Sequence, residues 1–200
     1  VTATEEVIFD VNKMAEGKRA YLFMNYEVSP DNKLAAYMSN ETGSFADFTL
    51  HVRDLANQAD LPVKIDKVQS FVWANDSKTI FYTVGNEALR SWRVYKHVIG
   101  NTKPDELVFE EPNEQFVVSL DKTKSKDFIF IVTASFTSSE YLFLPASEPE
   151  GKFKVFLPRV KDVEYAVTHH KDKFFIKYKD RKVEAEVREC NLFLAAVGDA

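Results

Sequence analysis

The chain has 200 residues, of which 45% are apolar and 28% are charged, the composition of a single globular domain. Its net charge is −5 and it has no block of lysine or arginine, which argues against a nucleic-acid partner. No apolar run reaches the ~18 residues that span a bilayer, and the first residues show no signal-peptide pattern, so we expect no membrane partner. Cys190 is the only cysteine, and a lone thiol fits a reducing, cytoplasmic location.

The first predicted element is a short strand, followed by a helical turn. Glu6-Val-Ile-Phe-Asp10 matches Glu106-Leu-Val-Phe-Glu110 almost residue for residue, so we expect Val7 to Asp10 to be the closing strand of a blade. The segment from Asp10 to Gly17 follows as a short helical turn. Elsewhere the sequence predicts no helix of note.

A repeat of roughly 45 residues then runs along the chain. Each copy has an apolar residue, a polar turn that ends in a lysine, and then a dense apolar run. The turn lysines are Lys33, Lys78, Lys126 and Lys173, at steps of 45, 48 and 47 residues (78 − 33, 126 − 78 and 173 − 126). Propeller blades repeat at roughly 40–50 residues, so we predict that these four lysines occupy equivalent positions on the same hairpin of successive blades. Pro, Asp, Asn and Ser in these turns favour tight connections.

Two kinds of strand are expected within the repeats. The run Phe128–Val132 is continuously apolar, as in a strand that is buried on both faces. Other strands alternate between apolar and polar residues, as strands with one wet face do. Their apolar positions are Phe48, Leu50 and Val52, and later Val183, Ala185 and Val187.

Together these elements predict an all-β chain that folds as a partial β-propeller, with about three to four blades of four antiparallel strands. Fourth strands close two of the blades, at 106–110 and 154–157. A generic antiparallel sandwich with accidental spacing is the alternative.

Several segments of the repeats resemble the oligopeptidase B family of serine peptidases. They are Ser70-Phe-Val-Trp-Ala-Asn-Asp-Ser77, Glu87-Ala-Leu-Arg90, Arg93-Val-Tyr-Lys-His-Val-Ile-Gly100, Val118–Lys126 with Thr137-Ser-Ser-Glu140, and Phe156-Leu-Pro-Arg159 with Glu164-Tyr165 and His169-His170. The resemblance covers roughly Glu5 to Tyr178. It indicates that residues 1–178 are a partial propeller from the N-terminal region of such a peptidase. Residues 179–200 form a divergent tail, a candidate to complete the last blade.

The resemblance implies a function that this chain would serve without catalysing it. Members of the family belong to the prolyl oligopeptidase group and pair an α/β-hydrolase domain with a seven-bladed propeller that caps the active site. The propeller gates access, so that only short peptides are cut, after Arg or Lys. The catalytic Ser, Asp and His come from the hydrolase part. The implied partners are therefore peptide substrates and the α/β-hydrolase domain of the parent enzyme, and the chain is not an enzyme as it stands.

The sequence offers no catalytic, cofactor-binding or metal-binding residues. A nucleophile elbow needs Gly-x-Ser-x-Gly, and no two of the six glycines flank a serine at that spacing. We interpret Ser138 and Ser139 as turn serines. His169 and His170 are adjacent on a predicted strand, where neighbouring side chains point to opposite faces, so the pair should not chelate one ion.

The remaining conspicuous residues have structural interpretations. Trp73 and Trp92 are interpreted as core residues between blades, rather than as ligand contacts in a central channel. Glu5-Glu6 and Glu110-Glu111 are interpreted as charges at strand ends that discourage edge pairing.

Two functions are compatible with these observations. The first is the non-catalytic propeller portion of an oligopeptidase B-like serine peptidase. The second is a stand-alone propeller-like module that binds a protein partner. Because an incomplete propeller exposes an apolar blade face at each end, here with Phe174 and Phe175, we also expect self-association through the end blades.

Overall fold

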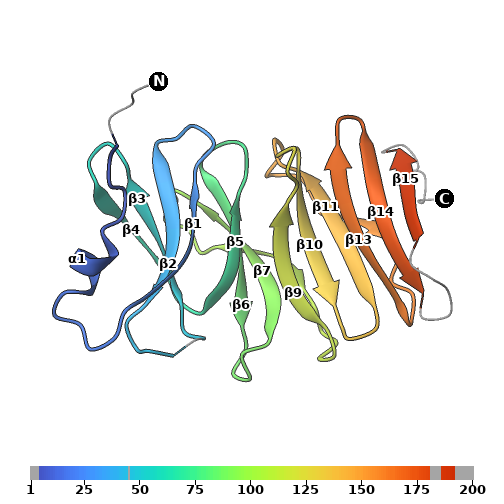
Figure 1. The fold of residues 1–200 in the computed structure, drawn as a ribbon, viewed down its shortest axis with the longest axis horizontal. Coiled ribbons are helices and arrows are strands. Elements are labelled where there is room, and N and C mark those ends of the chain that lie inside the picture. The colour runs from blue at the N-terminus through green and yellow to red at the C-terminus, as the bar shows by residue number, and fades with distance from the viewer. Residues whose placement is uncertain (1–4, 45, 181–185, 192–200) are drawn as a thin grey trace. The chain divides into compact units, whose positions relative to one another are not determined.

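The computed structural model describes residues 5–44, 46–180 and 186–191, and it divides into two compact units. Unit 1 runs from Val1 to Val68 and unit 2 from Gln69 to Ala200. Apart from the five-residue helix α1 (Val11–Ala15), the regular structure consists of strands (Figure 1). Among the described residues no helix has the length and apolar character needed to cross a membrane.

Each sheet is a meander in which every strand lies beside the next one along the chain. Sheet 1 comprises β1 (Leu22–Val28), β2 (Leu34–Asn40), β3 (Thr49–Asp54) and β4 (Ala59–Ile65). Sheet 2 comprises β5 (Val68–Trp73), β6 (Thr79–Gly85), β7 (Ser91–Val98) and β8 (Glu106–Glu110). Sheet 3 comprises β9 (Val117–Lys122), β10 (Phe128–Ala134), β11 (Ser139–Pro145) and β12 (Lys154–Leu157). Sheet 4 comprises β13 (Val163–His170), β14 (Lys173–Asp180) and β15 (Glu186–Asn191). The all-β architecture of propeller-type blades is thus confirmed, and the alternation predicted through 183–187 lies partly outside the described residues.

The first hairpin of every sheet contains the predicted polar turn. The residue two places before each second strand has a positive φ: Asn32, Ser77, Lys126 and Lys171. Several types of tight turn use such a left-handed residue. Lys33 and Lys78 immediately precede their second strands, whereas Lys126 lies one place earlier and Lys173 one place later. The repeat is therefore confirmed at the level of the hairpin, with small shifts in register.

Strand β10 is buried on both faces, which explains its continuous apolar sequence. Ile129 and Ile131 point into a core that sheets 2 and 3 share, together with Phe81 and Val94. Phe128 points into a second core, which sheets 3 and 4 share. Alternate residues of one strand thus supply two separate cores, as the sequence predicts.

The core between sheets 3 and 4 is built mainly from aromatic rings. Phe130, Phe156 and Phe174 pack edge-on at centroid distances of 5.0 to 6.3 Å, a geometry that the quadrupoles of the rings favour. The expectation that Phe174 is exposed on an end face is wrong, because the side chain is fully buried here. Its neighbour Phe175 points to the opposite face of the strand and is half-buried.

The segment before α1 is not the closing strand that the sequence predicts. Residues 7–10 belong to no strand, because sheet 1 already has β4 as its fourth strand and offers this segment no ladder to join. Side chains fix the segment instead. Arg53 Nη1 donates to the Ile8 carbonyl at 3.0 Å, and the Phe9 ring lies 4.9 Å from the Tyr37 ring. The helical turn predicted for Asp10 to Gly17 is confirmed as α1.

Sheets 1 and 2 repeat a polar clamp that ties the second strand to the fourth. Tyr37 Oη donates to Asp60 Oδ2 at 2.8 Å, and 45 residues later Tyr82 Oη donates to Asp105 Oδ2 at 2.7 Å (82 − 37 and 105 − 60). In sheet 2 the same carboxylate is 2.8 Å from Nδ1 of His97 on the intervening strand. One half-buried carboxylate, on the residue just before β8, thus binds side chains of both the second and the third strand.

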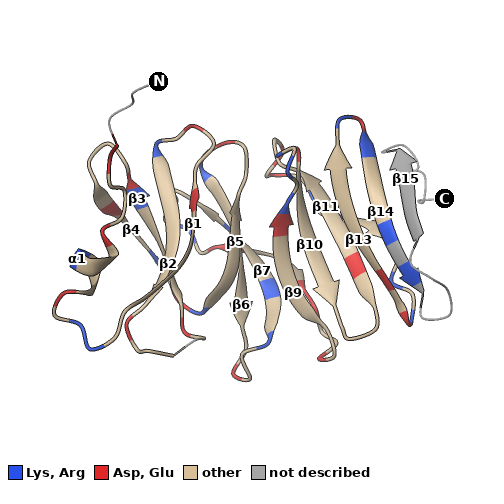
Figure 2. Ribbon diagram, viewed as in Figure 1, with Lys and Arg blue, Asp and Glu red and all other residues tan. Residues whose placement is uncertain are grey.

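The two tryptophans have different surroundings. Trp73 is fully buried, which confirms its assignment to the core. The same prediction is wrong for Trp92, which is half-buried with the Arg93 guanidinium 3.9 Å from its ring centre. A cation over the face of an indole is a favourable surface interaction. Many of the other charged side chains lie in turns and at strand ends (Figure 2).

Replacing Phe130 by alanine should lower the free energy of unfolding by about 3–5 kcal/mol, because it empties a close-packed aromatic core. Phe136→Ala is the matched control, since that ring is 97% exposed and surface changes usually stay within about 0.5 kcal/mol. Urea unfolding followed by tryptophan fluorescence measures both variants. Equal losses for the two variants would contradict this assignment of the core.

The clamps also predict loss of stability in alkali. Burial, then the hydrogen bond and negative charge of the partner aspartate, raise the pKa of Tyr37 and of Tyr82 well above the ordinary 10.0. A folded state that holds a phenol proton more tightly than the unfolded state loses stability as pH rises above the unfolded pKa. We therefore expect the free energy of unfolding to fall progressively above about pH 10, and to fall less steeply in Tyr82→Phe. Unfolding curves at a series of pH values test this, and a pH-independent stability up to pH 12 would contradict it.

Candidate functional site

Four connections gather at one end of the sheets of unit 2, which we call the crossing end. They are the turns 86–90 and 135–138 between second and third strands, and the crossings 111–116 and 158–162 that lead from one sheet to the next. In a meander of antiparallel strands these connections fall at the same end of each sheet. Side-chain hydrogen bonds join these four connections to one another.

Arg90 holds the crossing from sheet 2 to sheet 3. Its Nη1 donates to the carbonyls of Phe116 at 2.8 Å and Asn113 at 3.1 Å, and its Nη2 donates to the Glu111 carbonyl at 3.2 Å. These carbonyls belong to a loop and lack the ladder partners that a strand would give them. The planar fork of one guanidinium satisfies all three and fixes the loop.

Arg159 connects the same loop with sheet 3. Its Nη2 donates to Glu111 Oε2 and to Thr133 Oγ1, and lies 3.4 Å from Glu140 Oε2. The guanidinium also lies 3.6 Å from the centre of the Phe116 ring. We call Arg159, Glu111, Glu140, Thr133 and Phe116 the Arg159 cluster. The two carboxylates of the cluster carry one more charge than Arg159 can balance. Arg90, which binds the Glu111 carbonyl, supplies the second positive charge.

The interpretation of Glu111 as a charge that deters edge pairing is wrong. Glu111 is only 4% exposed and is neutralised by Arg159, so it cannot present a charge at a sheet edge. Its neighbour Glu110 does lie at a strand end, but it forms an ion pair with Arg93 at 2.5 Å. A buried carboxylate such as that of Glu111 is stable only when charged and hydrogen-bonding partners satisfy it. Glu6 is also paired, through Gln58 Nε2 at 2.7 Å.

Ser138 and Ser139 connect sheet 3 with sheet 4 at the same end. Ser139 Oγ accepts from the Tyr165 backbone N–H and donates to the Tyr165 carbonyl, both at 2.8 Å. Ser138 Oγ accepts from the backbone N–H of Asp162 at 2.9 Å. Both serines are buried, and each hydroxyl accepts a hydrogen bond from a backbone N–H. Their interpretation as serines of a turn and strand start is confirmed, and neither geometry suits a nucleophile.

Large apolar side chains project from the crossing end into solvent. Leu89, Val117, Phe136 and Val160 are each at least half exposed, and Phe136 reaches 97%. Leu89 also has a φ of +63°, a strained conformation for a bulky residue. Such strain persists where the surrounding structure enforces it, and it concentrates at functional sites. The crossing end therefore combines a rigid polar base with an exposed apolar surface.

A serine, a histidine and an aspartate also meet in the first turn of sheet 3, but not as a catalytic triad. Ser125 Oγ lies 2.8 Å from His169 Nδ1, and Asp127 Oδ2 lies 3.4 Å from the same nitrogen. A triad needs the acid on one ring nitrogen and the nucleophile on the other. His169 is buried against Phe128, whereas His170 is exposed, as opposite faces of a strand require. Within the described ranges no group of three or more His, Cys, Asp or Glu side chains could hold a metal ion.

Removing the cation of the Arg159 cluster should be costly. Arg159→Met leaves the Glu111 carboxylate buried without its charge partner, and breaking such a pair costs about 3–5 kcal/mol. Lys33→Met is the matched control, because its ion pair with Asp31 is long, at 3.7 Å, and exposed; this change should leave the unfolding midpoint unchanged. Thermal and urea unfolding measure both variants. If Arg159→Met matches the control, the cluster does not hold the crossing.

The sequence of this chain matches a known protein family and several known proteins. Residues 1–192 match the family model described as "Prolyl oligopeptidase, N-terminal beta-propeller domain". A dipeptidyl aminopeptidase BI from Pseudoxanthomonas mexicana is 36% identical over 178 residues, which are 88% of this chain and 24% of that protein. Protease 2 from Moraxella lacunata is 29% identical over 195 residues, 95% of this chain and 28% of that protein. The chain thus spans about a quarter of the length of these relatives.

A solved structure shows the same arrangement of strands. Oligopeptidase B from Leishmania major superimposes with a TM-score of 0.85 and 25% sequence identity, over 93% of this chain and 27% of that one. The parent family consists of serine peptidases, and the matched region is their propeller. The chain therefore belongs to the prolyl oligopeptidase family and represents sequence of its N-terminal β-propeller domain.

Proposed function

We propose that this chain is the non-catalytic propeller portion of an oligopeptidase B-like serine peptidase that cuts short peptides after Arg or Lys. The observation that carries the proposal is the family match over residues 1–192 in a chain that spans about a quarter of its relatives. The sequence itself has no Gly-x-Ser-x-Gly elbow. Peptide hydrolysis then belongs to an α/β-hydrolase domain encoded elsewhere in the parent protein, and the propeller gates access to it.

The crossing end is the surface that best suits the hydrolase domain. Arg90 and the Arg159 cluster hold its loops through charge-assisted hydrogen bonds, so the surface is fixed before docking. Phe136 and Leu89 offer exposed apolar contacts above this base. A preorganised surface with apolar anchors loses little entropy when a partner binds. We also place the parent enzyme in the cytoplasm, a setting compatible with a lone cysteine that can form no disulfide within this chain.

A second candidate reaction has a specific observation in its favour. The relative at 36% identity is named a dipeptidyl aminopeptidase, a name that denotes release of dipeptides from a free amino end. Protease 2 and oligopeptidase B, at 29% and 25% identity, favour the first candidate. A stand-alone binding module is a third possibility that the fold permits.

The test compares the 200-residue chain with the product of the full reading frame that contains it. We expect the chain alone to release no fluorophore from peptides blocked at the amino end and carrying Arg at the cleavage site. The longer product should cleave them, lose activity with a serine-reactive inhibitor, and leave folded proteins intact. Turnover by the chain alone, or a reading frame without a hydrolase region, would overturn the proposal.

Substrate choice separates the two peptidase candidates. A blocked Arg peptide and a dipeptide with a free amino end and a neutral second residue are assayed side by side. Preference for the blocked Arg peptide supports cutting after Arg or Lys, whereas strict need for the free amino end supports the dipeptidyl candidate. In the longer product, Phe136→Asp should reduce activity if the crossing end docks the hydrolase domain. Leu107→Asp, an exposed change on the outer strand β8, is its matched control and should not.

A further inference from the structure

Leu89, in the turn between β6 and β7, combines two features that each cost free energy. Its side chain is 55% exposed, and its backbone has a φ of +63°. The left-handed region is unfavourable for residues with a β-carbon, and a bulky residue there is an outlier. The turn from Asn86 to Arg90 therefore stores strain and at the same time leaves an apolar side chain in water.

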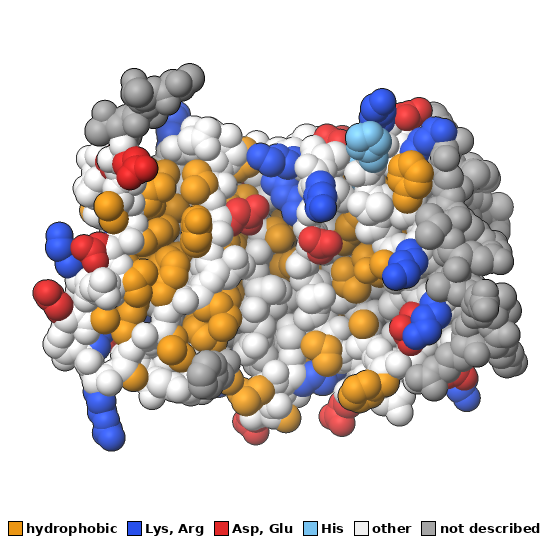
Figure 3. All heavy atoms as spheres, in the orientation of Figure 1, with side chains coloured by type: hydrophobic (Ala, Val, Ile, Leu, Met, Phe, Trp, Pro, Cys, Tyr) orange, Lys and Arg blue, Asp and Glu red, His pale blue; other side chains and the backbone are white. Residues whose placement is uncertain are grey.

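The combination is found at Leu89 alone among the residues that the structure describes. Nine non-glycine residues have a positive φ, and all except Leu89 are polar or charged. Hydrophobic side chains also gather over β1 and β2 of unit 1 (Figure 3), but the exposed ones there, Met24 and Tyr26, do not have a positive φ. Glycine or asparagine would satisfy such a turn without strain. The turn itself therefore does not explain a leucine at this position.

Backbone hydrogen bonds enforce the conformation of Leu89. The Asn86 carbonyl accepts from the Leu89 N–H, and the Asn86 N–H donates to the Arg90 carbonyl, both at 2.9 Å. Asn86 Oδ1 accepts from the Arg90 N–H, also at 2.9 Å. The Arg90 guanidinium then fixes the end of the turn through the three carbonyls of the 111–116 crossing. The chain thus holds Leu89 in place with bonds that do not use its side chain.

A further sheet that stacks on unit 2 would not bury Leu89. Sheets of this fold stack through their faces, as sheets 2, 3 and 4 do in the two shared cores. Leu89 instead lies beyond the ends of β6 and β7, in a turn at the crossing end. A partner that covers its side chain must approach the strands end-on, as a domain docked on the crossing end does.

We propose that Leu89 is an anchor residue of the crossing end, and that it inserts into an apolar socket of the hydrolase domain. The inference rests on the proposed function, and it adds the residue that docks and the chemistry of the surface that receives it. Strain that a fold maintains at one residue is a feature of functional sites. An anchor held in its bound conformation loses little entropy on docking, and a few such side chains carry most of the energy of an interface.

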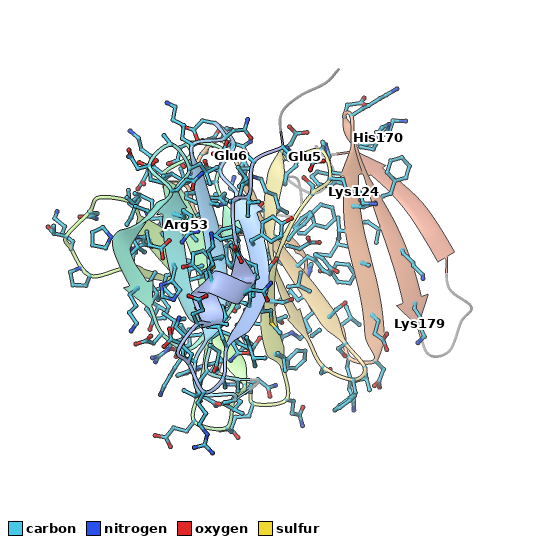
Figure 4. All side chains as sticks on the ribbon, turned by 60° about the vertical axis from the view of Figure 1, so that its left-hand side comes forward. Glu5, Glu6, Arg53, Lys124, His170 and Lys179 are labelled. Carbon is cyan, nitrogen blue, oxygen red and sulfur yellow. The ribbon has the colours of Figure 1, made fainter. Side chains whose placement is uncertain are left out.

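Substitutions that relieve the strain test whether Leu89 serves the fold of this chain or a partner. Glycine and asparagine adopt a positive φ readily. In the 200-residue chain, Leu89→Gly and Leu89→Asn should leave the thermal unfolding midpoint unchanged or raise it by up to about 4 °C. Lys126→Gly is the matched control, because Lys126 has a φ of +64° and is exposed in the turn of Lys124, which Figure 4 labels. A lower midpoint for both Leu89 variants would show that the residue serves the fold, and would overturn the inference.

In the product of the full reading frame, the same Leu89 variants should shift the other way. A docked domain stabilises the propeller that it binds. Loss of the anchor should therefore lower the unfolding midpoint of the propeller and reduce kcat/KM for the blocked Arg peptide by roughly tenfold. Leu89→Met keeps an apolar side chain and should retain most of the activity. Lys126→Gly, at the opposite end of the sheets, should leave the activity at the parental level.

The possible results distinguish this inference from the proposed function. An active product in which Leu89→Asn keeps the parental activity and midpoint overturns the inference and leaves the proposed function standing. An inactive product overturns the proposed function, and the unfolding midpoints of its Leu89 variants still decide whether the residue docks a second domain. A reading frame without a hydrolase region overturns both.

Discussion

Burial of the second strand on both faces is the constraint on which the rest of this structure depends. Sheet 3 shows it most clearly, because Ile131 and Phe130 are adjacent in β10 and yet fill different cores. A strand of this composition cannot lie at a surface without exposing one apolar face. Sheet 3 must therefore be covered on two sides, and its stacking between sheets 2 and 4 follows from the sequence of a single strand. The repeat of roughly 45 residues spaces such strands along the chain.

Stacking of the sheets does not determine the path of the loops at their ends. Polar side chains fix that path. A chain that passes from one sheet to the next must bring loop carbonyls and carboxylates close to a dry interior. Arg90 and Arg159 both bind one such crossing, Arg90 through three carbonyls and Arg159 through two carboxylates and a hydroxyl. The apolar cores hold the sheets of unit 2 together, and the two arginines fix the conformation of the loop that crosses from sheet 2 to sheet 3.

The sequence predicts features that depend on local pattern. The continuous run at 128–132 and the turns around Lys33 and Lys78 were identifiable because period and turn chemistry act over a few residues. The Arg159 cluster was not, because Glu111 and Arg159 are 48 residues apart and each looks like an ordinary surface charge. The Tyr–Asp clamp was within reach, since both members recur at a step of 45 residues, but its signal appears only when the repeats are aligned.

The wrong predictions have a common physical cause. The Val7 to Asp10 segment has the right composition for a strand, but a strand exists only where a neighbour offers hydrogen bonds. Trp92 is a residue type typical of a core, but it lies at a register irregularity of β7, between Ser91 and Arg93, and the Arg93 guanidinium covers its ring. In both cases the residue type indicates the right kind of environment, but the sequence does not show which neighbours the residue has in the fold.

The clamp also means that sheets of the same fold respond differently to cold. The fourth residue of the second strand is Tyr37 in sheet 1 and Tyr82 in sheet 2, but Ile131 in sheet 3. Where Asp105 precedes β8, Phe153 precedes β12 and packs against the apolar core. Apolar contacts weaken on cooling, whereas hydrogen bonds to a carboxylate do not share that dependence. We therefore expect β12 of sheet 3 to loosen on cooling before β4 and β8, which the Tyr–Asp hydrogen bonds also hold.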